Sequence, residues 1–211
     1  NESKTKQLIM GKDKDDISGL PNILSVDNLK HLGIILDANL KWDEHIDALC
    51  KRLSSGIYAL RRIKATGTTE AVKMTYSALI DSHIRYGIVL WGGTAQKNLN
   101  RVLVLQKKAV RMMAGLEWRV SCRPAFLEWR ILTVVNIYIL EVIIMACKMS
   151  PPRNRDVHQH FTRHASDFNL PSHHSRRYEG KPSYIGAKLY NCLPEEIKRS
   201  SPEKLKRVLH R

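Results

Sequence analysis

The side chains of this sequence best suited to binding a ligand are its lysines and arginines. The chain holds 35 Lys and Arg against 20 Asp and Glu, which gives a formal net charge of +15 at pH 7. Such an excess favours a polyanionic partner, either nucleic acid or an acidic membrane surface. Residues 1–50 carry a net charge of −3, residues 51–150 carry +11 and residues 151–211 carry +7. A polyanion should therefore contact the chain beyond about residue 50.

Three groups of basic residues stand out within this part of the chain. They are Lys51, Arg52, Arg61, Arg62 and Lys64 on one predicted helix, Lys107, Lys108 and Arg111 on another, and Arg119 and Arg123 on a connection. Rows of this kind contact phosphates without reading sequence, and their affinity falls as salt rises. A face that is merely solvated is the alternative interpretation.

No pattern in the sequence is typical of a catalytic site. Phosphate-binding glycine loops, a G-x-S-x-G turn and the H-E-x-x-H metal motif are all missing. Asp13, Asp15 and Asp16 alternate with lysines, which indicates a solvated polar turn rather than a metal site. Asp43 and Glu44 begin a predicted helix, where negative charge is favourable next to the N-terminal dipole.

Histidines and cysteines could in principle hold a metal ion. The candidates are His158, His160, His164, His173 and His174, with Cys147 or Cys192 as thiolate ligands. Their spacing matches no zinc finger or knuckle, so we expect solvent-exposed or phosphate-facing histidines, and no metal or cofactor is predicted in this chain. The four cysteines lie far apart, which favours reduced thiols in a nuclear or cytoplasmic protein.

Four tryptophans could be either stacking platforms for bases or part of the core. They are Trp42, Trp91, Trp118 and Trp129. Three of them flank predicted helices at apolar-face positions, so core or helix-end packing is the preferred interpretation.

The spacing of apolar residues predicts a mainly α chain, a helical bundle preceded by a small β-hairpin or meander. Residues 6–10 form the first expected strand, and residues 23–26 and 32–36 flank the turn-forming pair Asp27-Asn28. Amphipathic helices are predicted over residues 42–64, from residue 72 to a stop near Gly92-Gly93, and from residue 97 to a stop at Gly115. The remaining expected elements are helices over 124–129 and 134–148, a polar loop over 153–182, and short helices over 183–192 and 202–210.

The segment 131–147 is compatible with a membrane span or with a buried helix. It is apolar except for Thr133, Asn136 and Glu141. Its length lies at the lower limit of roughly 17 residues for crossing a bilayer. An acidic side chain near the middle would cost roughly 2.5–3.5 kcal/mol on insertion. A buried core helix capped by Thr133 is therefore predicted, without membrane association.

Several short strings occur in a recognisable order along the chain. They are NESKT at 1–5, KHLGIILD at 30–37, L-x-W-x-x-H-I at 40–46, YG at 86–87, WG at 91–92, LQKKAVR at 105–111, SCRPAF at 121–126, ILT at 131–133 and YNCLP at 190–194. This ordered set resembles the end of the palm, the thumb and the C-terminal region of non-LTR retrotransposon reverse transcriptases of the jockey-like, LINE type. The matching strings extend over nearly all of the chain.

The resemblance implies a division of the chain into three parts. Residues 1–40 would be a palm remnant, whose hairpin grips the primer terminus with His31, Leu32 and Gly33 at its turn. Residues 41–150 would form a helical thumb-like domain that holds a hybrid of RNA template and DNA primer. Residues 151–211 would be a basic, loop-rich C-terminal extension with short helices.

The resemblance also implies which chemistry lies elsewhere. The aspartates that hold two metal ions for nucleotidyl transfer would precede residue 1, so Mg²⁺ is expected only in the palm of the parent polymerase. The chain is thus expected to be the C-terminal portion of an RNA-directed DNA polymerase, inactive alone, with the N-terminal polymerase region as a partner. The alternative is a non-enzymatic basic helical module, derived from a retroelement fragment, that binds nucleic acid or a protein.

Overall fold

The chain forms two compact units that are each built largely from helices. The computed structural model describes residues 5–11, 16–158, 162–198, 200 and 204–205. The first unit comprises Asn1–Gly87 and Thr94–Met113, and the second comprises Ile88–Gly93 and Ala114–Arg211. The predicted mainly α fold class is confirmed. The assignment of residues 1–40, 41–150 and 151–211 to a palm remnant, a thumb-like domain and an extension stays a prediction.

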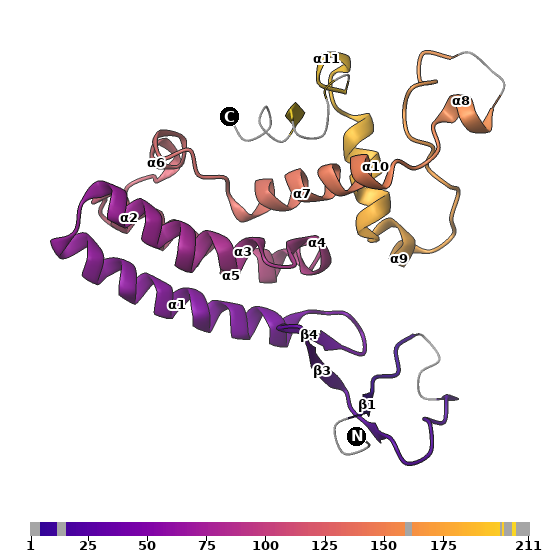
Figure 1. Cartoon of the computed structure of the whole chain (residues 1–211), viewed down its shortest axis with the longest axis horizontal. Helices are drawn as coiled ribbons and strands as arrows, with labels where there is room; N and C mark the ends of the chain where they lie inside the picture. Colours follow the sequence, from indigo (N-terminus) through magenta and orange to yellow (C-terminus); the bar gives the residue numbers. More distant parts are fainter. Residues whose placement is uncertain (1–4, 12–15, 159–161, 199, 201–203, 206–211) are drawn as a thin grey trace. The chain divides into compact units, whose positions relative to one another are not determined.

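The first unit is a bundle of helices preceded by short strands (Figure 1). The first helix and the helix at the end of the unit lie where the apolar spacing predicts them, while the middle helix is interrupted. The helical elements are α1 (Asp43–Thr66), α2 (Thr69–Tyr76), the π-helical turn η3 (Ser77–Asp81), α3 (Ser82–Arg85) and α5 (Gln96–Ala114).

Apolar side chains spaced three and four residues apart hold this bundle together. The buried face of α1 consists of Ile46, Leu49, Leu53, Ile57 and Leu60, and it packs against α2, η3 and α3. Gly56 allows this approach, because a Cβ there would lie only 2.9 Å from the carbonyl oxygen of Leu79. The buried Gln106 on α5 donates to the Tyr76 hydroxyl at 3.1 Å, and burial raises the pKa of that hydroxyl.

The predicted middle helix does not continue to Gly92-Gly93. It ends at Arg85, and Gly87 adopts a left-handed φ of 64°. Residues with this φ do not continue a right-handed helix, and glycine adopts it at no steric cost. The next helix, α4 (Ile88–Trp91), is therefore separate and belongs to the second unit.

Two small sheets lie at the start of the first unit. Strand β1 (Lys6–Gln7) pairs in parallel with β2 (Leu24–Ser25), and β3 (Asn28–His31) pairs antiparallel with β4 (Ile34–Asp37). The predicted hairpin exists, but its turn is at Leu32-Gly33 and the expectation of a turn at Asp27-Asn28 is wrong. Asn28 opens β3 opposite Asp37, and both turn residues have a positive φ, 46° and 83°. A two-residue hairpin turn of this kind requires that conformation at both positions.

The second unit is organised around α7 (Val134–Met149). The other helices of this unit are α4, α6 (Arg123–Glu128), α8 (Asn154–Val157), α9 (Arg176–Glu179), α10 (Pro182–Asn191) and α11 (Glu195–Lys198). The prediction of a buried helix capped by Thr133 is confirmed, since the Thr133 hydroxyl accepts from the Asn136 N–H at 3.3 Å. Among the described residues, no helix has the length and apolar content to cross a membrane.

Helices α7 and α10 pack closely along a seam of small residues. Gly186 on α10 faces α7, and a Cβ at this position would lie 2.2 Å from the carbonyl oxygen of Val142. Ala146 and Ala187 are buried in the same core as Phe168 and Tyr190. The backbones can approach only because these positions carry little or no side chain.

The sequence suggested a polar loop over residues 153–182, but the structure shows that this segment is not a loop throughout. It contains the one-turn helices α8 and α9, and the first is held by the Asp156 carboxylate, which accepts from the Arg153 N–H at 2.8 Å. The short helix over 183–192 is confirmed by α10. Most of the expected helix over 202–210 lies outside the described residues, although Leu205 is buried in the core of the second unit.

Candidate nucleic-acid interface

The tip of the β3–β4 hairpin presents an exposed apolar side chain in a strained conformation. Leu32 is 76% exposed and has a left-handed φ of 46°, which costs a non-glycine residue roughly 1–2 kcal/mol. The Tyr86 hydroxyl donates to the Leu32 carbonyl oxygen and fixes the tip to the end of α3. Of the predicted primer-grip-like residues, His31 is exposed in β3, and Gly33 lies beneath the Tyr86 ring.

A carboxylate organises the junction between this hairpin and α1. Asp37, the last residue of β4, accepts hydrogen bonds from the backbone N–H groups of Asn39, Lys41 and Trp42 at 3.0, 3.0 and 2.8 Å. Partial burial alone would raise the pKa of Asp37, but these donors outweigh burial and hold the pKa below its usual range. The string L-D-x-x-L-x-W thus encodes a structural corner, in which Leu40 is also left-handed.

A buried histidine ties α1 back to the hairpin. His45 in the first turn of α1 accepts from the Ile35 N–H of β4 through Nδ1 at 3.4 Å, and its ring packs edge-on against Trp42. Burial, aided by the positive charge of Arg52, lowers the pKa of His45. The imidazole is therefore neutral at pH 7 and acts as an acceptor.

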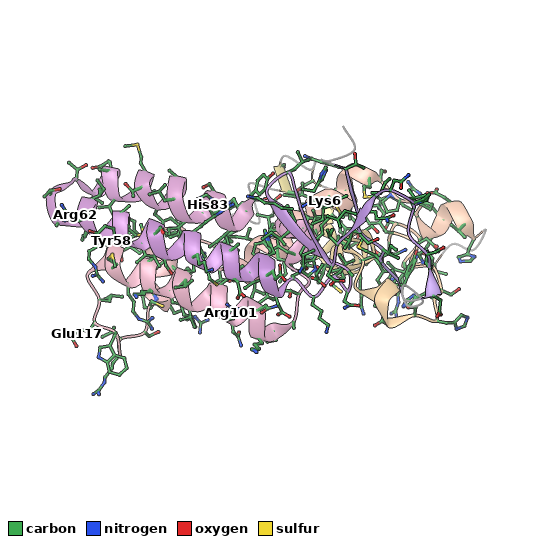
Figure 2. The ribbon with its side chains drawn as sticks, turned by 90° about the horizontal axis from the view of Figure 1, so that it is seen from below. Lys6, Tyr58, Arg62, His83, Arg101 and Glu117 are labelled. Carbon is green, nitrogen blue, oxygen red and sulfur yellow. The ribbon has the colours of Figure 1, made fainter. Side chains whose placement is uncertain are left out.

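The five predicted phosphate-binding residues of α1 are all exposed, but they do not share one face. Successive helical residues are rotated by about 100°, so Lys51 and Arg62 lie on one stripe while Arg52 and Arg61 lie on opposite flanks. Lys64 is in the last turn, where positive charge complements the C-terminal dipole. Tyr58 is 63% exposed and lies on the stripe between Lys51 and Arg62. Figure 2 labels Tyr58 and Arg62 toward the C-terminal end of α1.

Helix α5 presents a more coherent basic face. Its outward positions, about 100° per residue around the axis, bring together Lys97, Arg101, Lys107, Lys108 and Arg111. No acidic residue occurs between Gln96 and Ala114. The Arg101 guanidinium pairs across to Asp47 on α1, whereas Lys107, Lys108 and Arg111 are further along the helix. Three of the predicted binding residues are thus neighbours on one surface.

The second unit carries a different basic feature on the connection before α6. The Arg119 guanidinium lies 4.6 Å from the centre of the Trp118 ring, and Trp118 is 76% exposed. The expectation that the tryptophans pack inside holds for Trp42 and Trp91, which are buried, but it is wrong for Trp118. Arg123, the remaining predicted binding residue, is exposed at the start of α6.

Comparison with known proteins places these elements in an evolutionary context. The chain is 34% identical over 94 residues to the probable RNA-directed DNA polymerase from transposon BS of Drosophila melanogaster. The matched region covers 43% of this chain and 10% of that protein. It is 30% identical over 98 residues to the RNA-directed DNA polymerase from mobile element jockey of Drosophila funebris, covering 44% of this chain and 11% of that protein. The chain is related to the RNA-directed DNA polymerases of non-LTR retrotransposons.

This relationship extends over about half of the chain. A further match, to the probable RNA-directed DNA polymerase from transposon X-element of Drosophila melanogaster, has 24% identity over 110 residues and covers 51% of the chain. The chain spans only about a tenth of the length of these polymerases. No family model matches the chain, and no solved structure matches it.

Two of the histidines considered as metal ligands, His164 and His173, have other partners in the structure. His164 pairs with Asp167 at 2.9 Å, and His173 contacts two tyrosine rings and Glu179. In the described part of the chain, no three His, Cys, Asp or Glu side chains are grouped so that they could hold a metal ion. His160, Asp13 and Asp15 lie outside the described residues.

Two aromatic side chains are exposed although the sequence analysis did not select them for binding: Tyr58 was not considered, and packing was the preferred interpretation for Trp118. Tyr58 directly follows the buried Ile57 and so falls off the apolar face, which is a signal that the helical spacing could have supplied. Trp118 follows Gly115, the left-handed residue that ends α5, and lies in a turn rather than on a helix face. Helical periodicity therefore gave no information about its exposure.

The neutral state of His45 leads to a testable pH dependence. An unfolded histidine has a pKa near 6.5, and the folded pKa is lower, so His45 stabilises the fold above about pH 6.5 and this stability is lost as the pH falls through the folded pKa. Protonation also removes the acceptor for the Ile35 N–H. We expect His45→Asn, whose amide oxygen can accept in place of Nδ1, to lose less stability between pH 7 and pH 5 than the wild type.

Urea unfolding at both pH values measures this difference, which should be about 1 kcal/mol, the worth of one hydrogen bond. His174→Asn serves as the matched control, because His174 is exposed. An identical loss of stability in the wild type and in H45N would show that His45 is not the titrating group.

Proposed function

We propose that this chain contributes template–primer binding to an RNA-directed DNA polymerase, as a region that follows the catalytic palm. The observation that carries the proposal is the acid-free basic face of α5. The relatives are named as RNA-directed DNA polymerases, and an enzyme of this type must hold an RNA–DNA hybrid. Nucleotidyl transfer itself is assigned to carboxylate-held metal ions in another part of the polymerase.

The α5 face suits the backbone of a paired nucleic acid. Lys107, Lys108 and Arg111 lie within four residues of one another on a helix whose own sequence holds no carboxylate. An A-like duplex is recognised mostly through phosphates, 2′-hydroxyls and shape, because its major groove is too narrow for side chains to read. Helix α5 therefore offers positive charge that can contact phosphates without reading the base sequence.

The hairpin tip has a second part in the proposal. Leu32 and Gly33 would contact the primer terminus, and the Tyr86 hydroxyl would hold the turn in place. Strained residues that are kept in position by the surrounding structure occur preferentially at functional sites. The exposed Leu32 side chain fits a contact with the apolar face of a terminal base or sugar.

Binding measurements with four nucleic acids test the proposal directly. Fluorescence anisotropy with an RNA–DNA hybrid, duplex DNA, single-stranded RNA and single-stranded DNA of equal length should show at least about ten-fold tighter binding to the hybrid, or about 1.4 kcal/mol. Equal affinity for all four would instead support the generic basic module. The measurements require a stated salt concentration, because affinity falls steeply with salt.

Replacing Leu32 by asparagine should separate primer contact from stability. Asparagine tolerates a left-handed φ better than leucine, so the free energy of unfolding should stay unchanged or rise by up to about 1 kcal/mol. The affinity of this variant for a hybrid with a recessed primer 3′ end should fall more than its affinity for a blunt hybrid. Urea unfolding and anisotropy give the two readouts.

Leu40→Asn is the control for this experiment. Leu40 is also an exposed leucine with a left-handed φ, 54°, but it lies in the corner before α1. If both variants lowered the affinity for the recessed primer equally, the hairpin tip would have no special part in primer binding.

A further inference from the structure

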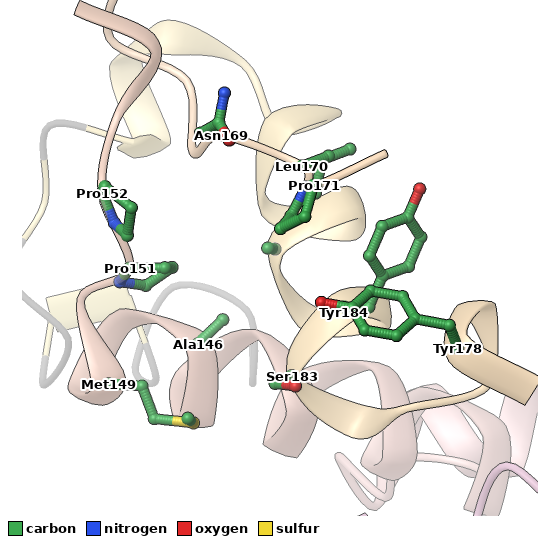
Figure 3. A pocket seen from close by; sticks show the side chains of 11 residues that line it. Ala146, Met149, Pro151, Pro152, Asn169, Leu170, Pro171, Tyr178, Ser183 and Tyr184 are labelled. Atoms are coloured by element: carbon green, nitrogen blue, oxygen red, sulfur yellow. The ribbon is translucent and has the colours of Figure 1, made fainter. Parts of the chain in front are cut away.

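The second unit contains a pocket with flat walls. It has a volume of about 260 Å³ and lies between the end of α7, the segment that follows Phe168, and helices α9 and α10. Figure 3 shows Tyr178 and Tyr184 next to each other, with Pro151 and Pro152 on the other side of the pocket in this view. Small side chains on α7 and α10, among them Ala146 and Ser183, leave the space open.

The two tyrosines of the pocket wall belong to an aromatic cluster whose other members, His173 and the cation Lys181, do not line the pocket themselves. The rings of Tyr178 and Tyr184 meet edge to face at 5.6 Å, and His173 stacks on Tyr178 at 5.1 Å. The Lys181 ammonium lies 4.3 Å from the centre of the Tyr178 ring. Glu179 contributes an opposing charge, but it is engaged by His173 Nε2 at 3.4 Å.

The shape and charge of this site narrow the class of ligand. Pockets for whole cofactors or drug-sized ligands typically measure about 300–1,000 Å³, so this volume suits one planar ring system. Aromatic rings beside a cation are the combination by which proteins hold unpaired bases and their phosphates. Residues 151–211 carry a net charge of +7, which is complementary to a nucleic-acid strand and unfavourable for a basic peptide.

We propose that this pocket binds one unpaired base of single-stranded nucleic acid, with the neighbouring phosphate beside Lys181. The base packs against Tyr184 and the edge of the Tyr178 ring, because His173 and the Lys181 ammonium already lie over Tyr178, and the prolines form the opposite wall. The inference takes nucleic acid as the ligand from the proposed function, but it assigns a separate site with a different task. The α5 face holds the backbone of a paired hybrid, whereas this pocket captures a base that has left a duplex.

Methyl NMR of the full chain tests the proposal without any substitution. The methyl groups of Met149, Leu170 and Ala187 line the pocket and report on a ring that enters it. The probes are adenosine 5′-monophosphate, adenosine, ribose 5-phosphate and a proline-rich peptide. We expect saturable shifts with adenosine 5′-monophosphate, weaker binding of adenosine, and no shift of these methyls with ribose 5-phosphate.

Substitutions at two positions then separate the parts of the site. Tyr184→Leu should weaken adenosine 5′-monophosphate binding about ten-fold, the scale of one base–aromatic contact, while Tyr184→Phe keeps the ring and should bind within about two-fold of the wild type. Lys181→Ala should weaken adenosine 5′-monophosphate but leave adenosine unchanged. A structural role for Tyr184 alone would not produce that split between the two ligands.

Two results would overturn the inference. One is an equal response of the methyl groups to ribose 5-phosphate and to adenosine 5′-monophosphate. The other is tighter binding of the proline-rich peptide at the same methyl groups. Failure of this site is distinguishable from failure of the proposed function, because alanine at Lys107, Lys108 and Arg111 should weaken hybrid binding roughly 10²–10³-fold without changing the methyl shifts.

Discussion

Replacing Lys107, Lys108 and Arg111 together by alanine should weaken binding of an RNA–DNA hybrid by roughly 10²–10³-fold at 0.1 M salt. Each phosphate neutralised by a basic side chain contributes about 0.9 to the slope of log affinity against log salt. The slope of the triple variant should thus be smaller by up to about 3. The measurement is anisotropy across a salt series with wild type and variant.

A charge-conserving variant is the matched control for this triple substitution. Lys107→Arg, Lys108→Arg and Arg111→Lys in one chain keep three positive charges at the same positions, so the slope should stay within about one unit of the wild type. The free energy of unfolding should change little in either variant, because surface substitutions usually stay within about 0.5 kcal/mol. An unchanged slope in the alanine variant would remove α5 from the binding surface.

Replacing Gly186 by alanine should destabilise the second unit by about 2–4 kcal/mol. A Cβ at this position would lie 2.2 Å from the Val142 carbonyl oxygen and 3.0 Å from the Ala146 Cβ. The nearest of these atoms belongs to the backbone of α7, so the helices must separate to admit a methyl group. Alanine is favoured over glycine within a helix by about 1 kcal/mol, and the clash must exceed this gain.

Hydrogen exchange of the α7 amides, together with urea unfolding, measures this effect in the second unit. Lys188→Ala on the exposed face of α10 is the control and should stay within about 0.5 kcal/mol of the wild type. If the unfolding free energy of G186A equalled or exceeded that of the wild type, a methyl group would fit between α7 and α10, and the predicted clash would be wrong.

Helices with a clear apolar period were predictable from the sequence, whereas their interruptions were not. The apolar spacing located α1 and α5 because their buried faces repeat every three or four residues over many turns. The same spacing continues across Gly87, so the end of α3 was missed. Periodicity reports which face is buried, and a single left-handed residue leaves that pattern nearly unchanged.

The hairpin shows how tertiary contacts override local turn preference. Asp27 and Asn28 are common turn residues, but Asn28 pairs with Asp37, and the turn forms at Leu32-Gly33. Leucine is unfavourable at such a position, and the Tyr86 hydroxyl from a distant part of the sequence holds it there. The resemblance to the polymerase strings indicated this turn, because it draws on related sequences rather than on local preference.

The sequence predicted which basic residues are exposed in the candidate interface better than it predicted how they are arranged. Charge counting alone selected the basic residues of α1 and α5, and all of them are at least partly exposed. It could not separate the contiguous face of α5 from the divided set on α1. Exposure of Trp118 depended on a turn outside any helix, for which the sequence offers no periodic signal.

The corner at Asp37 has a mechanical consequence for the first unit. Its backbone hydrogen bonds, together with the His45 bond to Ile35, join the hairpin directly to the 24-residue α1. A helix of that length measures about 36 Å, so a tilt of about 5° displaces one end by about 3 Å relative to the other. A displacement of Arg62 at the far end of α1 should therefore also change the direction in which Leu32 points.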